Sequence, residues 1–92
     1  MNRITGQAHR GWLEKLVDGK QLHEYKPMSK HWKARLSKRA APFELLLING
    51  YGRNTFQAVF LISKVETLSE GGGYREPVFK LTISKVLEVR NR

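Results

Sequence analysis

Several residues that could do acid–base or ionic chemistry are crowded into one short segment of the chain. Lys20, His23, Glu24 and Lys26 all belong to the stretch GKQLHEYK, residues 19–26. A hydrophobic core gives little reason for such crowding, because charged side chains are seldom buried. General acid–base catalysis uses titratable groups of these types, so Lys20, Glu24 and His23 are candidate catalytic residues. The same polar density is typical of a surface that handles a charged, planar ligand.

A strand over residues 21–26 would divide these groups between two faces. Leu22, Glu24 and Lys26 would share one face, while Gln21, His23 and Tyr25 would share the other. Adjacent side chains would then point apart, so His23 and Glu24 could not bind one metal ion together. The sequence therefore predicts neither a metal site nor a bound cofactor.

The charge of the chain indicates a polyanionic partner. Seventeen Lys and Arg residues against eight Asp and Glu residues give a net charge of +9 and an isoelectric point near 10.3. Basic side chains are densest between residues 20 and 39. They are Lys20, Lys26, Lys30, Lys33, Arg35, Lys38 and Arg39. Lys and Arg neutralise phosphates, and aromatic rings can stack on unpaired bases, so this segment, which also holds Tyr25 and His31, predicts a surface for RNA or a nucleotide, with a single strand favoured. Trp32 itself is expected in the core.

The pattern of apolar residues predicts one α+β domain over residues 1–92, with a short strand first. Helices are expected over 8–18 and 30–39, and strands over 21–26, 43–48, 55–68 and 78–90. Gly19 would end the first helix in the left-handed conformation, and Ser29 would cap the second. The first helix places His9 in its apolar arc, one turn before Leu13, as a packing histidine. The architecture expected is a small, mostly antiparallel sheet curled into a barrel, with two helices at one side and Phe56, Phe60, Leu81 and Ile83 in its core.

GKQLHEYK resembles the GxKxxExR signature of the ASCH (activating signal cointegrator homology) domains, which belong to the PUA-like β-barrel group. Four further stretches resemble the same family, so the likeness spans most of the chain. These are the helix ending at Gly19, the helix that holds residues 29–36, the turn at residues 49–51 and the closing strand 79–88. The resemblance implies an RNA- or nucleotide-binding cleft lined by the signature strand. The predicted nucleic-acid-binding residues are Lys20, Glu24, Tyr25, Lys26, Lys30, Lys33, Arg35, Tyr51 and Arg53.

Two departures from the signature bear on catalysis. Gln21 stands where the family has Lys, and Lys26 where it has Arg. Relatives that hydrolyse an acetylated cytidine nucleoside use that Lys together with a hydroxyl residue at the position of Glu24, and other relatives are reported to cut RNA. An amide such as Gln21 supplies neither a cation nor a base, so the resemblance favours binding over hydrolysis.

Two alternatives to a binding module stay open at this point. One is a small amidohydrolase or ribonuclease, and the other is a basic adaptor for an acidic protein partner. The chain lacks cysteine, an apolar leader at its N-terminus and any segment long enough to cross a membrane, so we expect a cytoplasmic protein. Its small size also suits a phage-encoded protein that acts in the host cytoplasm.

Overall fold

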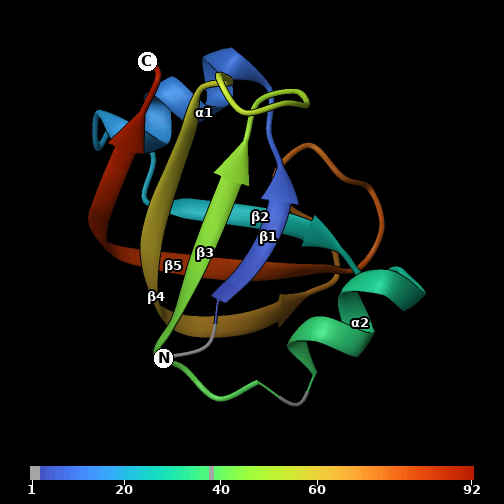
Figure 1. Ribbon diagram of the computed structural model, residues 1–92. Helices are drawn as coiled ribbons and strands as arrows, with labels where there is room; N and C mark the ends of the chain where they lie inside the picture. Colours follow the sequence, from blue (N-terminus) through green and yellow to red (C-terminus); the bar gives the residue numbers. More distant parts are fainter. Residues whose placement is uncertain (1–2, 38) are drawn as a thin grey trace.

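The computed structural model describes residues 3–37 and 39–92 and shows two helices beside a five-stranded sheet (Figure 1). The strands are β1 (Arg3–Gln7), β2 (His23–Pro27), β3 (Phe43–Ile48), β4 (Gln57–Leu68) and β5 (Val78–Arg90), and the helices are α1 (Arg10–Val17) and α2 (Lys30–Leu36). The strand order is β1-β3-β4-β5-β2, and only the β1–β3 pair is parallel. The predicted α+β class, with two helices and a mostly antiparallel sheet, is confirmed.

The sheet is strongly curled because β4 and β5 bend together. The first half of β4 pairs with β3, and its second half pairs with the part of β5 that also holds β2. Register shifts between Val59 and Phe60, and around Ile62, mark β-bulges where the two halves meet. A bulge adds an unpaired residue and bends its strand, so these positions form the corner of the sheet (Figure 1).

The curl brings the two edge strands near each other without closing a barrel. Within residues 3–37 and 39–92, β1 pairs only with β3, and β2 pairs only with β5. The two strands run in different directions where they meet (Figure 1), so their backbones cannot form a regular ladder. The barrel expected from the sequence is therefore an open, curled sheet with a gap between β1 and β2.

The core fills the concave side of this sheet. The predicted core residues Phe56, Phe60, Leu81 and Ile83 are all buried, as are Leu13 and Leu16 of α1 and Leu36 of α2. The strict alternation of β5 breaks at Leu87, which lies at a bulge without a register partner and is exposed, while Val86 packs against the core. A bulge shifts the inward face by one residue, which the sequence pattern did not reveal.

The helix ends are set by local capping. Gly19 has φ +73°, as predicted for the residue that ends α1, and Ser29 Oγ accepts a hydrogen bond from the backbone N–H of Trp32 at 3.3 Å. α1 begins at Arg10, two residues later than predicted, so His9 precedes the helix and is exposed. The prediction of His9 as a packing residue was wrong. α2 ends at Leu36, three residues earlier than predicted.

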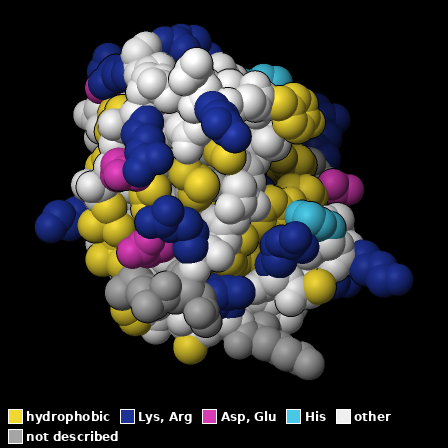
Figure 2. Space-filling view, in the orientation of Figure 1, with side chains coloured by type: hydrophobic (Ala, Val, Ile, Leu, Met, Phe, Trp, Pro, Cys, Tyr) yellow, Lys and Arg dark blue, Asp and Glu magenta, His cyan; other side chains and the backbone are white. Residues whose placement is uncertain are grey.

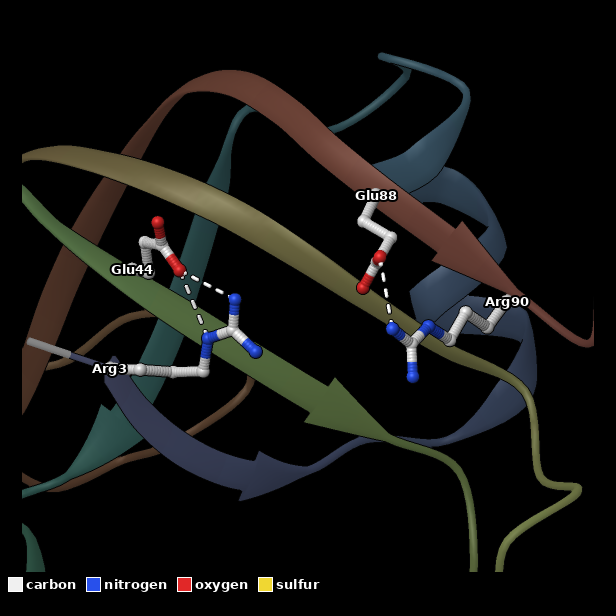
Figure 3. A network of polar contacts seen from close by, with 4 residues as sticks. All are labelled: Arg3, Glu44, Glu88 and Arg90. Atoms are coloured by element: carbon white, nitrogen blue, oxygen red, sulfur yellow. Dashed lines mark hydrogen bonds and ion pairs between the residues drawn. The ribbon is translucent and has the colours of Figure 1, made fainter. Parts of the chain in front are cut away.

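Exposed ion pairs lie on the outer face of the strands. Arg3 of β1 lies opposite Glu44 of β3, with its Nη2 2.7 Å from the carboxylate, and Arg90 Nη2 lies 3.1 Å from Glu88 on β5 (Figure 3). Exposed pairs of this kind contribute about 0–1 kcal/mol each. They do not determine the fold, which follows from burial on the concave side.

Candidate ligand-binding cleft

The gap between β1 and β2 forms a cleft of about 280 Å³. Its walls come from the end of β1, the start of α1, strand β2 and the loop between β4 and β5. The lining residues are Gln7, Ala8, His9, Trp12, Glu24, Tyr25, Lys26, Gly72 and Tyr74. The segment singled out in the sequence therefore contributes three residues of the cleft, all from β2.

Glu24 is the buried acid of the cleft. Strand alternation directs Glu24 and Lys26 inward, and only 4% of Glu24 is exposed. Its Oε1 accepts hydrogen bonds from Trp12 Nε1 at 2.9 Å and from the backbone N–H of Tyr25 at 2.8 Å. Its Oε2 lies 3.4 Å from Lys26 Nζ. A carboxylate oxygen accepts two hydrogen bonds, so Oε2 keeps acceptor capacity for a ligand that enters the cleft.

The Lys26 side chain connects β2 to β1 and to α2 across the gap. Its Nζ donates a hydrogen bond to the backbone carbonyl of Gln7 at 3.0 Å, at the end of β1. The same ammonium lies 5.2 Å from the ring centroid of Trp32 on α2, a cation–π distance. Lys26 is only 8% exposed, so this cation belongs to the wall of the cleft and not to the outer basic surface.

The glycine-rich loop after β4 packs against Tyr25 and contributes Tyr74 to the lining of the cleft. Gly72 has φ +58°, and a Cβ placed on it would lie 2.3 Å from Tyr25 Cγ, so only glycine lets the loop lie this close to the Tyr25 ring. Tyr74, two residues on, is 37% exposed and lines the cleft. Burial raises the pKa of the Tyr74 phenol, and the charges of Glu24 and then Glu76 raise it further. Glu24 and Tyr74 therefore face the same space.

The three candidate catalytic residues are not brought together. Lys20 is exposed in the turn after α1, outside the residues that line the cleft. His23 alternates with Glu24 on β2, and its ring centroid lies 6.5 Å from that of Tyr25. Glu24 is thus the one member of the three that lines the cleft.

Apart from Lys26, the predicted nucleic-acid-binding cations lie outside the set of residues that line the cleft. Lys30, Lys33 and Arg35 are exposed on α2, and Arg35 Nη1 lies 3.2 Å from His31 Nδ1. Tyr51 and Arg53 are exposed in the turn between β3 and β4. Lys38 lies outside the described residues. Figure 2 shows Lys and Arg side chains scattered over the face that it draws, without a single continuous basic patch.

Six of the nine residues that line the cleft were missed by sequence reasoning, and they include Gln7, Trp12 and Tyr74. In the sequence, Trp12 fits the apolar arc of the first helix, and nothing distinguishes Gln7 or Tyr74. Trp12 did carry a signal, since a partly buried indole N–H needs an acceptor and Glu24 needs donors. The sequence holds no comparable signal for Tyr74 or for the Gln7 carbonyl, because their positions depend on how the β4–β5 loop and the end of β1 meet β2.

Among residues 3–37 and 39–92, no three His, Asp or Glu side chains are grouped as metal ligands. The helices in that part of the chain are all too short or too polar to cross a membrane. Comparison of the chain with protein-family models, with curated proteins and with solved structures found no match.

Replacing Lys26 alone should cost far more stability than replacing both members of the buried pair. We expect Lys26→Met to lower the free energy of unfolding by about 3–5 kcal/mol, because it leaves a buried carboxylate without its counter-charge. Lys26→Met combined with Glu24→Gln should recover much of that loss. Urea unfolding measures both. Lys64→Met, at the exposed pair with Glu66, is the control and should cost under about 1 kcal/mol. If the loss in the double variant equals the sum of the losses from Lys26→Met and Glu24→Gln made separately, Lys26 and Glu24 are not a coupled pair.

Titration of Tyr74 tests whether Glu24 faces it across the cleft. We expect Glu24→Gln to lower the pKa of Tyr74 toward its ordinary value near 10.0, without reaching it, because burial is the larger cause of the rise. A raised pKa means that the folded state holds the phenol proton more tightly. The associated stability is therefore present below the pKa of the unfolded chain and is lost as pH rises through the folded pKa.

The measurement is an NMR titration of the Tyr74 ring at alkaline pH. Glu76→Gln serves as the control and should lower the pKa less, because Glu76 contributes least to the rise. A Tyr74 pKa that responds to Glu76→Gln but not to Glu24→Gln would show that the two cleft residues do not face each other.

Proposed function

We propose that this chain is an RNA- or nucleotide-binding module of the PUA-like ASCH type, which receives a base in the cleft between β1 and β2. The observation that carries the proposal is the Glu24 carboxylate, buried at the cleft with one oxygen held by two donors and the other able to accept more. A carboxylate in such a position suits a ligand that presents an amino group. Cytosine, adenine and guanine carry one.

The size and lining of the cleft favour a small planar ligand. Its 280 Å³ lies just below the range for ligand sites, about 300–1,000 Å³, so it suits a small ligand. Trp12 and Tyr74 supply aromatic surface beside the carboxylate, and base–aromatic stacking contributes about 1–3 kcal/mol per base. A single base with its sugar fits these properties better than a folded protein segment does.

The resemblance of GKQLHEYK to the ASCH signature supports the same assignment. The strand that carries the signature supplies Glu24, Tyr25 and Lys26 to the cleft, which is where the family's ligand site is expected. The net charge of +9 and the exposed cations of α2 favour an anionic ligand, as a nucleic acid or nucleotide is. The proposed compartment is the cytoplasm, where RNA and free nucleotides are found.

A hydrolase is the less favoured function. Lys20 and His23 do not join Glu24 at the cleft, and Gln21 replaces the family's Lys. Incubation of the purified protein with acetylated cytidine and with single-stranded RNA should leave both unchanged. Turnover abolished by Glu24→Ala would make the hydrolase the better description.

The cleft should prefer cytidine monophosphate over uridine monophosphate. Cytosine offers an amino donor to Glu24 Oε2, whereas uracil places a carbonyl oxygen at the same position. We expect a preference of about 1–3 kcal/mol, measured by calorimetric titration, and we expect Glu24→Gln to remove most of it. Glu44→Gln, on the outer face of β3, is the matched control and should keep the preference. Equal affinities for the two nucleotides in the wild-type protein would count against Glu24 as the base-reading group.

Binding of a longer single-stranded RNA should depend on salt through the cations of α2. Each phosphate contact that is lost should lower the slope of log K against log salt by about 0.7. We therefore expect Lys33→Ala and Arg35→Ala to lower the slope by that amount, and Lys85→Ala, at the corner of the sheet on β5, to leave it unchanged. Anisotropy titrations at several salt concentrations provide the slopes. A slope insensitive to both α2 variants would remove this helix from the interface.

A further inference from the structure

Two further hollows adjoin the cleft through shared lining residues. One, of about 320 Å³, reaches the β3–β4 turn and is lined by Gln7, Ala8, His9, Asn49, Gly50, Tyr51 and Tyr74. The other, of about 300 Å³, reaches α2 and is lined by Thr5, Gly6, Gln7, Lys26, His31 and Trp32. The first shares four residues with the cleft, and the second shares Gln7 and Lys26 with it. The three hollows therefore adjoin one another along β1, with Lys26 lining both the cleft and the hollow at α2, and this row of hollows is called the groove.

The length of the groove exceeds what one nucleotide occupies. Thr5 lines the end near α2, Gln7 lines all three hollows, and His9 lines the end near the β3–β4 turn. A strand advances about 3.3 Å per residue, so Thr5 to His9 covers about 13 Å. Successive bases stacked in one strand are separated by about 3.4 Å, so this length spans three to four base steps.

Each part of the groove offers an aromatic surface. Tyr51 is 89% exposed at one end, which leaves its ring open to a ligand. Trp32 lies at the other end, and a Cβ on Gly6 would come within 3.0 Å of its Cη2, so glycine at position 6 lets the indole lie against β1. His31 meets the Trp32 ring edge-on, with centroids 5.2 Å apart. Trp12 and Tyr74 occupy the middle.

Exposed cations belong to the elements at both ends of the groove. Arg35 contacts His31 on α2, and Arg53 belongs to the same β3–β4 turn as Tyr51. In the space-filling view, hydrophobic side chains lie between β1 and α2 next to Lys, Arg and His side chains (Figure 2). Aromatic faces with cations nearby are the features that bind single strands, whose bases stack while their phosphates are neutralised.

We propose, on the basis of the function proposed above, that the groove binds a single-stranded oligonucleotide of at least three nucleotides. The central base enters the cleft at Glu24. One neighbour lies against Tyr51, and the other lies against His31 and Trp32. A duplex is excluded from this mode, because its paired bases could not separate into three hollows.

Ligand length tests this arrangement. Affinities are measured for cytidine monophosphate, for ribo- and deoxyribotrinucleotides with a central cytidine, and for a ribohexanucleotide. We expect the better trinucleotide to bind at least tenfold more tightly than the monophosphate, and the hexanucleotide to add only a few-fold more. Whichever trinucleotide, ribo or deoxyribo, gains more affinity over cytidine monophosphate identifies the preferred sugar. Tyr51→Ala and His31→Ala should each reduce the ratio of trinucleotide to monophosphate affinity several-fold, and Leu87→Ala, exposed on β5, should leave it unchanged.

The outcomes separate this inference from the proposed function. A trinucleotide that binds no better than the monophosphate would overturn the groove and leave the base-binding cleft intact. A gain in affinity that neither Tyr51→Ala nor His31→Ala reduces would also overturn it, because the added nucleotides would then lie elsewhere. If none of the nucleotides binds, the proposed function fails and this inference fails with it.

Discussion

The interaction on which the rest of the site depends is the buried contact of Lys26 with Glu24 and with the Gln7 carbonyl. It joins the two edge strands of the curled sheet where no backbone ladder does in residues 3–37 and 39–92. The Lys26 ammonium offsets the desolvation cost of burying the Glu24 carboxylate. That carboxylate in turn accepts a hydrogen bond from the Trp12 indole and so holds it beside the cleft. Lys26 also lies over Trp32, so the position of α2 is coupled to the same charge.

Leaving the sheet open at this gap makes space for a ligand. A closed barrel would pair β1 with β2 and place inward side chains where the cleft now lies. In this chain the gap is spanned by a long side chain, which crosses it at one point and leaves hollows on either side. The polar groups that border these hollows are fixed by strands, and residues fixed by strands hold their geometry better than residues on loops. The β4–β5 loop adds one wall, and Gly72 lets it approach Tyr25 closely.

Much of the fold could be predicted from the sequence because its determinants are local. Apolar alternation located β3, β4 and β5 within two residues, and Gly19 and Ser29 marked helix ends through capping chemistry. The open gap could not be predicted, since it depends on bulges that shift register at the corner of the sheet. Glu24 was identified from residue types alone. Its partnership with Trp12 and its proximity to Tyr74 arise from tertiary packing, and so does the separation of Lys20 from the cleft.

The measurement that tests this account most directly is the response of the two tryptophan indole N–H signals to cytidine monophosphate in an NMR titration. The Trp12 Nε1–H donates to Glu24, so a base that competes for this carboxylate should shift that signal more than any other indole or exposed-face amide. The Trp32 signal should move less, because a single nucleotide fills only the central cleft. Shifts confined to exposed residues of β4 and β5, such as Lys64 and Lys85, with the Trp12 signal unmoved, would contradict the account.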